Sequence, residues 1–206
     1  MAKYSGAEWR PVPNFTKGGN QPKLLIMHIM VGTLAGTDSW FHNPASQVSA
    51  HFGVSKTGEV YQWVDTADMA WHAADANSHS IGIEHEGMPG DALTAAQLQA
   101  DAKILAWAHK HHPDISMWLT TKPSGSGLAW HGLGGAAWGN HPQCPGKPIV
   151  GELPEVLAVA KAILNPLPTW AKAAVADLQA IASALADHTL AGDVAAVIDL
   201  IEKNAK

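Results

Sequence analysis

The residues best suited to chemistry gather in one short stretch, Trp130–Gly146, with the sequence WHGLGGAAWGNHPQCPG. It contains the only cysteine of the chain, Cys144, together with His131 and His141. A lone cysteine cannot form an internal disulfide, so its thiol is expected to pack in the interior, act as a nucleophile or bind a metal ion. The stretch by itself leaves these three alternatives open.

A histidine far away in the sequence extends this set to a metal site. His28 is embedded in the apolar run Lys23–Val31, KLLIMHIMV, which is typical of a buried central strand. Two imidazoles and a thiolate are donors that suit zinc, and three protein ligands leave one position free for water. His28, His131 and Cys144 therefore predict a site for one zinc ion.

The surrounding sequence predicts a single mixed β-sheet flanked by helices, in the α/β class. Residues 48–55 and 59–64 alternate around a Gly-containing turn, which is typical of a β-hairpin. Residues 80–86, SIGIEHE, are expected to form a strand with Glu84 and Glu86 on one face. Further elements are predicted as helices over 37–43, 94–112 (with a capping box) and 152–164, and as a strand over 115–119.

Four segments are expected along the chain. They are an irregular N-terminal arm (1–22), a main domain (23–164), a Pro-containing linker (165–168) and an Ala-rich helical hairpin (169–206). Within the main domain, the Gly-rich residues 123–148 are expected to be mostly loop. The hairpin helices are predicted over 169–187 and 193–203, joined near Gly192, and we expect so small a unit to pack on the main domain or to self-associate.

Composition excludes several functional classes. The net charge is −5 and the pI about 6.1, so no polycationic surface for nucleic acid is expected. No stretch approaches the roughly 20 apolar residues of a membrane-spanning helix, and the first residues lack the apolar core of a secretory signal. We therefore expect no nucleic-acid partner, no membrane insertion, and synthesis in a reducing compartment of the cell that makes the protein, which it leaves only when something else releases it.

Four sequence motifs follow one another along the chain: LLIMHIMVG, then VSAHFGVSKTGEVYQWV, then AWHAA followed by SIGIEHEG, and a closing H…CPG. Together they resemble the zinc-dependent N-acetylmuramoyl-L-alanine amidase family, whose fold is shared with peptidoglycan recognition proteins. The resemblance covers roughly residues 23–164. It implies a zinc-dependent hydrolase that cleaves the amide bond between N-acetylmuramic acid and L-alanine in bacterial peptidoglycan, with zinc ligands at His28, His131 and Cys144.

The same resemblance suggests a catalytic base. One branch of the family places a tyrosine immediately before the histidine of the hairpin, and here that position is Ala50, before His51. The other branch uses the glutamate of SIGIE, which is Glu84, and we assign Glu84 as the general base. The family often has an oxyanion-stabilising lysine two residues before the last ligand. Here that residue is Pro142, so the oxyanion role is unassigned, with His141 or Lys147 as substitutes.

Four side chains are expected to contact the substrate: His72, Trp71, His51 and His141. For the histidine of AWHAA, the alternative is a buried structural role. His141 also competes with His131 for the second metal position. We favour His131, because a His-x-x-Cys pair on one kinked loop leaves little slack around a single small ion.

Several functions remain open at this level. The first is a phage or prophage endolysin, and the second is a cytosolic amidase that recycles wall fragments. A third is a peptidoglycan-binding module without activity, but members of the fold that only bind usually lack the cysteine ligand, which is present here as Cys144. A fourth is a cysteine amidase, against which Cys144 precedes Pro-Gly in a loop instead of lying at a helix N-terminus.

Overall fold

The computed structural model describes residues 2–185 and 188–205. Contacts divide the chain into two units, Met1–Lys161 and Ala162–Lys206. The division falls in the last turn of helix α3 (Lys147–Leu164), just before the expected linker. This helix begins before residue 152, its expected start, and runs up to the expected linker. Each unit is described by itself below.

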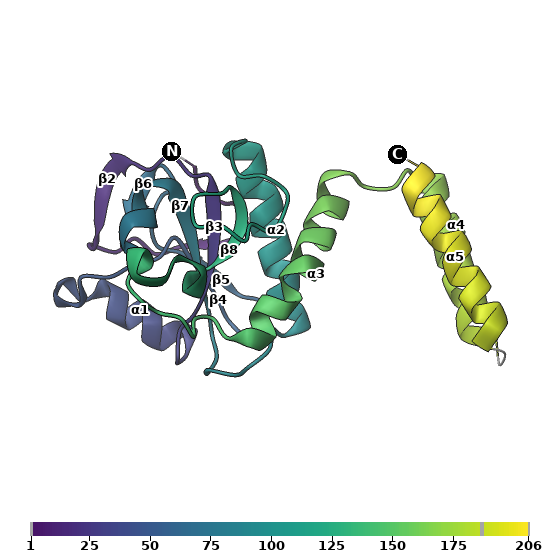
Figure 1. Ribbon diagram of the computed structural model, residues 1–206, viewed down its shortest axis with the longest axis horizontal. Helices are drawn as coiled ribbons and strands as arrows, with labels where there is room; N and C mark the ends of the chain where they lie inside the picture. Colours follow the sequence, from purple (N-terminus) through teal and green to yellow (C-terminus); the bar gives the residue numbers. More distant parts are fainter. Residues whose placement is uncertain (1, 186–187, 206) are drawn as a thin grey trace. The chain divides into compact units, whose positions relative to one another are not determined.

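A six-stranded mixed sheet forms the centre of the first unit, in the order β1-β5-β4-β7-β3-β8 (Figure 1). Strand β3 is parallel to both of its neighbours, β7 and β8, and β4 is parallel to β7 and antiparallel to β5, as the predicted hairpin requires. The expected mixed sheet flanked by helices is therefore confirmed. The strands are β1 (Glu8–Trp9), β3 (Leu24–Ile29), β4 (Phe52–Val54), β5 (Val60–Gln62), β7 (Ser80–His85) and β8 (Gly127–Trp130).

Strand β3 is buried along its whole length, as its apolar sequence predicts for a strand covered on both faces. In its register with β7, His28 is opposite Glu84. Residues paired on neighbouring strands project to the same face of a sheet. The pairing therefore brings the expected metal ligand and the expected base together without any loop.

Helices cover the two faces of the sheet, with α1 (Leu34–His42) and α2 (Ala95–His111) on either side of the strands in Figure 1. Successive residues of β4 show the alternation: the Phe52 ring lies 5.9 Å from the Trp107 ring of α2, whereas Gly53 leaves room for Leu34 of α1. The capping box of α2 is confirmed, since both reciprocal hydrogen bonds of Thr94 and Gln97 form. Shorter 3₁₀ helices are η1 (Pro44–Ser46), η2 (Ala74–His79) and η3 (His131–Trp138).

The N-terminal arm is not irregular, contrary to expectation. Strand β1 pairs in parallel with β5 at the edge of the main sheet. Strand β2 (Phe15–Gly19) pairs with β6 (Asp68–Ala70) in a separate two-stranded sheet. Both are short and mostly exposed and are separated by prolines, so their sequences carry no period-two pattern. Hydrogen bonds to strands distant in sequence, and not local preference, order these residues.

Three other expectations differ from the structure. Helix α1 begins at Leu34, three residues before the predicted start, because Thr33 caps it by accepting a hydrogen bond from Gly36 N. The strand expected over 115–119 is reduced to a single bridge between Leu119 and Leu128. The expected loop over 123–148 contains β8 and η3, whose four and eight residues are Gly-rich and give no strong periodicity.

The second unit contains α4 (Thr169–Ala184) and α5 (His188–Asn204). Gly192 lies inside α5, so the expected junction near it is wrong, and the predicted end of the first helix at 186–187 falls outside the described residues. Among its exposed large apolar side chains are Trp170, Ile181, Leu190, Val197 and Leu200. Across the described part of the chain, no helix has both the length and the hydropathy that crossing a bilayer requires.

A buried ionisable pair joins α2 to the central strands. The His85 Nδ1–H donates to the backbone oxygen of His28 over 2.7 Å, and its Nε2 lies 2.9 Å from both carboxylate oxygens of Asp101. Both side chains are fully buried. Burial lowers the pKa of His85, but the nearby Asp101 carboxylate outweighs this effect, so that its pKa is raised overall.

We expect Asp101→Leu to lower the free energy of unfolding by about 3 kcal/mol or more, because it leaves one side of a buried imidazole without a partner. Asp101→Asn is the matched control, since its amide can donate to Nε2 of a neutral His85 and should lose less. Chemical denaturation of the three proteins measures the difference. Equal stability of the leucine variant and the wild type would contradict this account.

Candidate metal-binding active site

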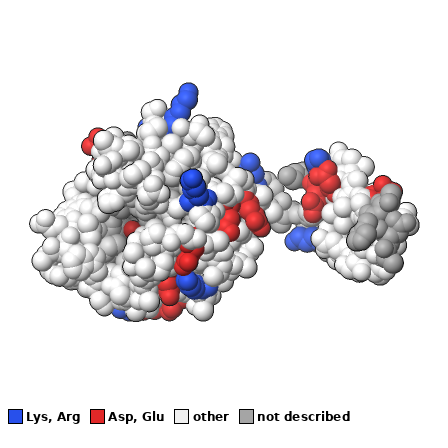
Figure 2. All heavy atoms as spheres, turned by 60° about the horizontal axis from the view of Figure 1, so that its bottom comes forward, with Lys and Arg blue, Asp and Glu red and all other residues white. Residues whose placement is uncertain are grey.

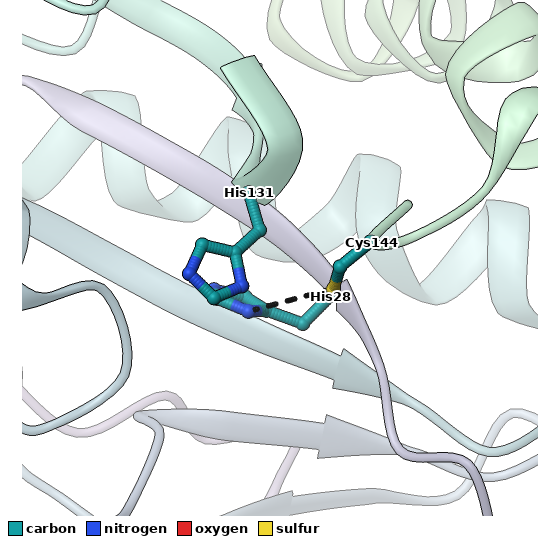
Figure 3. Close-up of side chains that lie close together, drawn as sticks. All are labelled: His28, His131 and Cys144. Carbon is teal, nitrogen blue, oxygen red and sulfur yellow. Dashed lines mark hydrogen bonds between the residues drawn. The ribbon is translucent and has the colours of Figure 1, made fainter. Parts of the chain in front are cut away.

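The three expected ligands come together in space. The donor atoms of His28, His131 and Cys144 all lie within 4.8 Å of one another, and Cys144 Sγ is 4.0 Å from His28 Nδ1. Figure 3 shows the three side chains pointing toward one another from a strand, the start of a 3₁₀ helix and a loop. Atoms that share one zinc ion lie roughly 3–4 Å apart, so small side-chain adjustments suffice to bind it.

The strands explain why the two histidines meet. Met27 of β3 pairs with Trp130 of β8, so that the residues that follow them, His28 and His131, lie close together at the carboxyl ends of these two parallel strands. The loop of Cys144 is attached beside them, since Gly132 N donates to Cys144 O over 2.8 Å. A side chain at Gly132 would press against Pro142 O, so this close approach requires glycine.

Each histidine has one ring nitrogen occupied by the protein. The Nε2–H of His131 donates to Trp138 O over 2.7 Å, and Nε2 of His28 lies 3.0 Å from Nδ1 of His72. The Nδ1 atom of each histidine is then the one that can bind a metal ion together with the sulfur of Cys144. Burial lowers the pKa of both His28 and His131, and the neutral imidazole is the form that binds a metal ion. The residues present therefore fit a zinc site.

The environment of Cys144 does not suit a nucleophile. Burial raises the pKa of its thiol to about 12, and the negative charge of Glu84 acts in the same direction. Reactive cysteines have instead a lowered pKa, from a helix N-terminus or a nearby cation. Burial of the thiol beside a carboxyl group therefore disfavours the cysteine-amidase alternative.

Glu84 lies beside the three donors. Its Oε1 is 3.9 Å from His28 Nδ1, and its Oε2 is buried with no hydrogen-bond partner among the described residues. Burial raises the pKa of this carboxyl to about 7. A carboxylate that can gain and lose a proton near neutral pH, with an oxygen left unpaired, has the properties of a general base.

These residues open into a cleft of about 770 Å³. Its wall includes exposed apolar side chains that sequence reasoning missed, among them Val31 and Trp40. Among the residues that the structure describes, no Lys or Arg lines the cleft. Lys147 is thus not among the lining residues, whereas His141 is. Trp40 could have been suspected only from its place on a short helix that follows the strand of His28.

His141 stands beside the ligands instead of among them. Its side chain is exposed, and its ring centre is 4.8 Å from that of His131, with an angle of 30° between the planes. Within the described chain, the group of close donors contains His131 and not His141. His141 is therefore placed to contact a bound molecule at the rim of the cleft.

The other three expected substrate residues are placed differently. His51 is fully buried, accepting from Gly82 N at Nδ1 and facing Asp68 O at Nε2, so the expected substrate contact is wrong. Burial lowers its pKa to about 4. Trp71 lies outside the cleft lining, where its Nε1–H donates to Thr16 of β2. His72 lines the cleft, but both of its ring nitrogens are engaged within the protein.

We expect Glu84→Gln to raise the free energy of unfolding by about 2 kcal/mol at pH 8, measured with a chelator present. A carboxyl whose pKa is raised from 4.5 to about 7 costs stability when ionised, and this cost grows as the pH rises through that window. The gain should therefore be small at pH 4. The exposed Glu59→Gln is the control, and a similar gain there would refute the explanation.

Known proteins resemble this chain in sequence. The family model described as N-acetylmuramoyl-L-alanine amidase matches residues 18–147. N-acetylmuramoyl-L-alanine amidase A of Achromobacter lyticus is 42% identical over 106 residues, which are 49% of this chain and 60% of that protein. The 1,6-anhydro-N-acetylmuramyl-L-alanine amidase AmpD of Escherichia coli is 37% identical over 82 residues, 36% of this chain and 45% of that protein. The chain thus matches less than two thirds of the length of either relative.

Solved structures agree in fold. A mutant endolysin from Bacillus subtilis has a TM-score of 0.56 at 22% identity, covering 74% of this chain and 96% of that one. The Drosophila peptidoglycan recognition protein SA has a TM-score of 0.56 at 16% identity, covering 72% and 91%. The expected fold is confirmed by these likenesses. The family model matches residues 18–147, more than half of the chain, and this match establishes that the chain belongs to the N-acetylmuramoyl-L-alanine amidase family.

Proposed function

We propose that this chain is a zinc-dependent hydrolase that cleaves the amide bond between N-acetylmuramic acid and L-alanine of peptidoglycan. The observation that carries the proposal is that His28, His131 and Cys144 gather in an open cleft beside Glu84, whose buried Oε2 has no hydrogen-bond partner among the described residues. Family membership and the names of the relatives support the bond that is cleaved.

The three donors would hold one zinc ion, which when bound supplies a Lewis acid for the carbonyl and lowers the pKa of water. Glu84 takes a proton from the attacking water as the oxygen adds to the lactyl carbonyl carbon. It then returns this proton to the alanine nitrogen as the C–N bond breaks. The products are a lactyl carboxylate and a peptide with a free L-alanine amino terminus.

The distribution of charge on the surface does not favour a polyanionic substrate such as nucleic acid. On the face in Figure 2, uncharged residues cover most of the area, and the Lys and Arg groups are interspersed with Asp and Glu. With a net charge of −5, nothing favours nucleic acid by charge. Within the cleft, recognition falls to apolar walls, His141 and backbone groups.

We expect zinc-loaded protein to release L-alanine amino termini from purified walls, and a chelator to abolish this until zinc is restored. Cys144→Ser should reduce the rate at least 100-fold and leave wall binding intact, because it removes a zinc ligand by exchanging only the sulfur atom for oxygen. Glu84→Gln should lower kcat by about 10²–10⁴-fold while zinc content stays at one per chain.

Two outcomes would contradict this proposal. Wild-type protein that binds walls but releases no amino termini would be a binding module. Activity that persists under chelation and disappears on thiol alkylation would identify a cysteine amidase, contrary to the environment of Cys144.

We further assign the chain to wall lysis as a phage or prophage endolysin, made in the host cytoplasm and acting after release. In this role the second unit, with exposed Trp170 and Leu200, serves in wall targeting or self-association. The endolysin of similar fold supports this role. The likeness to AmpD, named for a 1,6-anhydro substrate, favours the alternative of fragment recycling.

The two roles predict different substrates. An endolysin should solubilise intact sacculi, and deletion of residues 165–206 should slow this reaction by about tenfold or more, as expected when a second attachment is lost. Hydrolysis of soluble muropeptides by the same deletion variant should be unchanged, which controls for its folding. Rapid hydrolysis of soluble 1,6-anhydro muropeptides with no action on sacculi would assign the chain to recycling.

A further inference from the structure

A chain of hydrogen bonds leads away from the first expected zinc ligand. Nε2 of His28 lies 3.0 Å from Nδ1 of His72, whose Nε2 is 3.2 Å from Ser80 Oγ. Ser80 Oγ in turn lies 2.6 Å from Ala76 O.

The direction of every bond in this chain is determined by its last member. A backbone carbonyl only accepts, so the Ser80 hydroxyl must donate to Ala76 and can only accept from His72. His72 therefore carries its proton on Nε2 and presents a lone pair at Nδ1. The His28 proton must then be on Nε2, because otherwise two lone pairs would face each other across 3.0 Å.

The position of the His72 ring is fixed from two further sides. Its backbone N–H donates to Asn77 Oδ1 over 2.9 Å, and Ala73 N donates to the same oxygen over 2.7 Å. Its ring lies against the backbone of Gly82 in β7, where a Cβ would come within 2.7 Å of Nδ1. Glycine at 82 is thus what allows the ring to lie at hydrogen-bonding distance from His28.

We propose that His72, oriented by Ser80 and Gly82, is a positioning residue that holds His28 in the tautomer with its Nδ1 lone pair directed at the metal. A ligand histidine whose other nitrogen has a fixed partner binds more tightly, and loss of such a partner typically costs 10–100-fold in metal affinity. His72 thereby acts on zinc through His28 and makes no contact with substrate through its own ring nitrogens.

The first test uses the protein without metal. We expect ¹⁵N NMR of the full chain to show His28 protonated at Nε2 and unprotonated at Nδ1. Ser80→Ala removes the acceptor of the His72 proton and should yield a mixture of His28 tautomers. The exposed Ser78→Ala, two residues earlier, should leave the spectrum of His28 unchanged. A single, unaltered Nε2–H tautomer in Ser80→Ala would overturn the proposal.

The second test is zinc affinity, measured by competition with a chromogenic chelator. His72→Leu and Gly82→Ala should each weaken zinc binding by 10–100-fold. His72→Asn, which retains an oxygen acceptor close to the place of Nδ1, should recover most of the loss. Gly151→Ala is the control for the glycine change, because a Cβ there meets no atom within 4 Å.

This inference rests on the zinc site proposed above, and the two fail differently. If wild-type protein binds no zinc, the proposed function fails, whereas the tautomer of His28 still reports on His72. If the wild type binds zinc and the folded His72→Leu variant binds it equally well, only the role of His72 is overturned. Circular dichroism of each variant verifies that it is folded before either conclusion is drawn.

Discussion

Burial of His28 at the end of the central strand is the constraint on which the rest of the site depends. A polar ring in the interior is costly unless each polar atom finds a partner. The protein meets this demand with three different segments: His72 at one ring nitrogen, the Cys144 loop at the other, and His85 at the backbone oxygen. Satisfying one residue therefore organises residues that are far apart in the sequence.

The parts of the fold that follow from local pattern were predictable. The apolar run around His28, the hairpin at 56–58 and the capping box at Thr94 each carry their signal within a few residues. The donor set was predictable for a related reason. Strands and short loops leave few ways to arrange their ends, and the Met27–Trp130 pairing then places both histidines at the carboxyl ends of neighbouring parallel strands.

The remaining features of the fold and of the site depend on contacts with residues distant in sequence, which no local pattern predicts. Strand β1 exists because β5 offers it hydrogen-bonding groups, and η3 follows a strand of only four residues. His51 and His72 both seemed suited to contact substrate, yet the ring nitrogens of each are engaged by groups at least eight residues away in sequence. A histidine has the same sequence signature in both roles, so only its surroundings in three dimensions distinguish them.

The contact between Asp101 and His85 also has a mechanical consequence. It joins the middle of α2 to the carbonyl of the strand that carries His28, across the face of the sheet opposite the cleft. Helices packed on a sheet can usually slide by small steps as side chains repack. Here sliding would break the buried contact between Asp101 and His85, so we expect α2 and the strand of His28 to keep a fixed register.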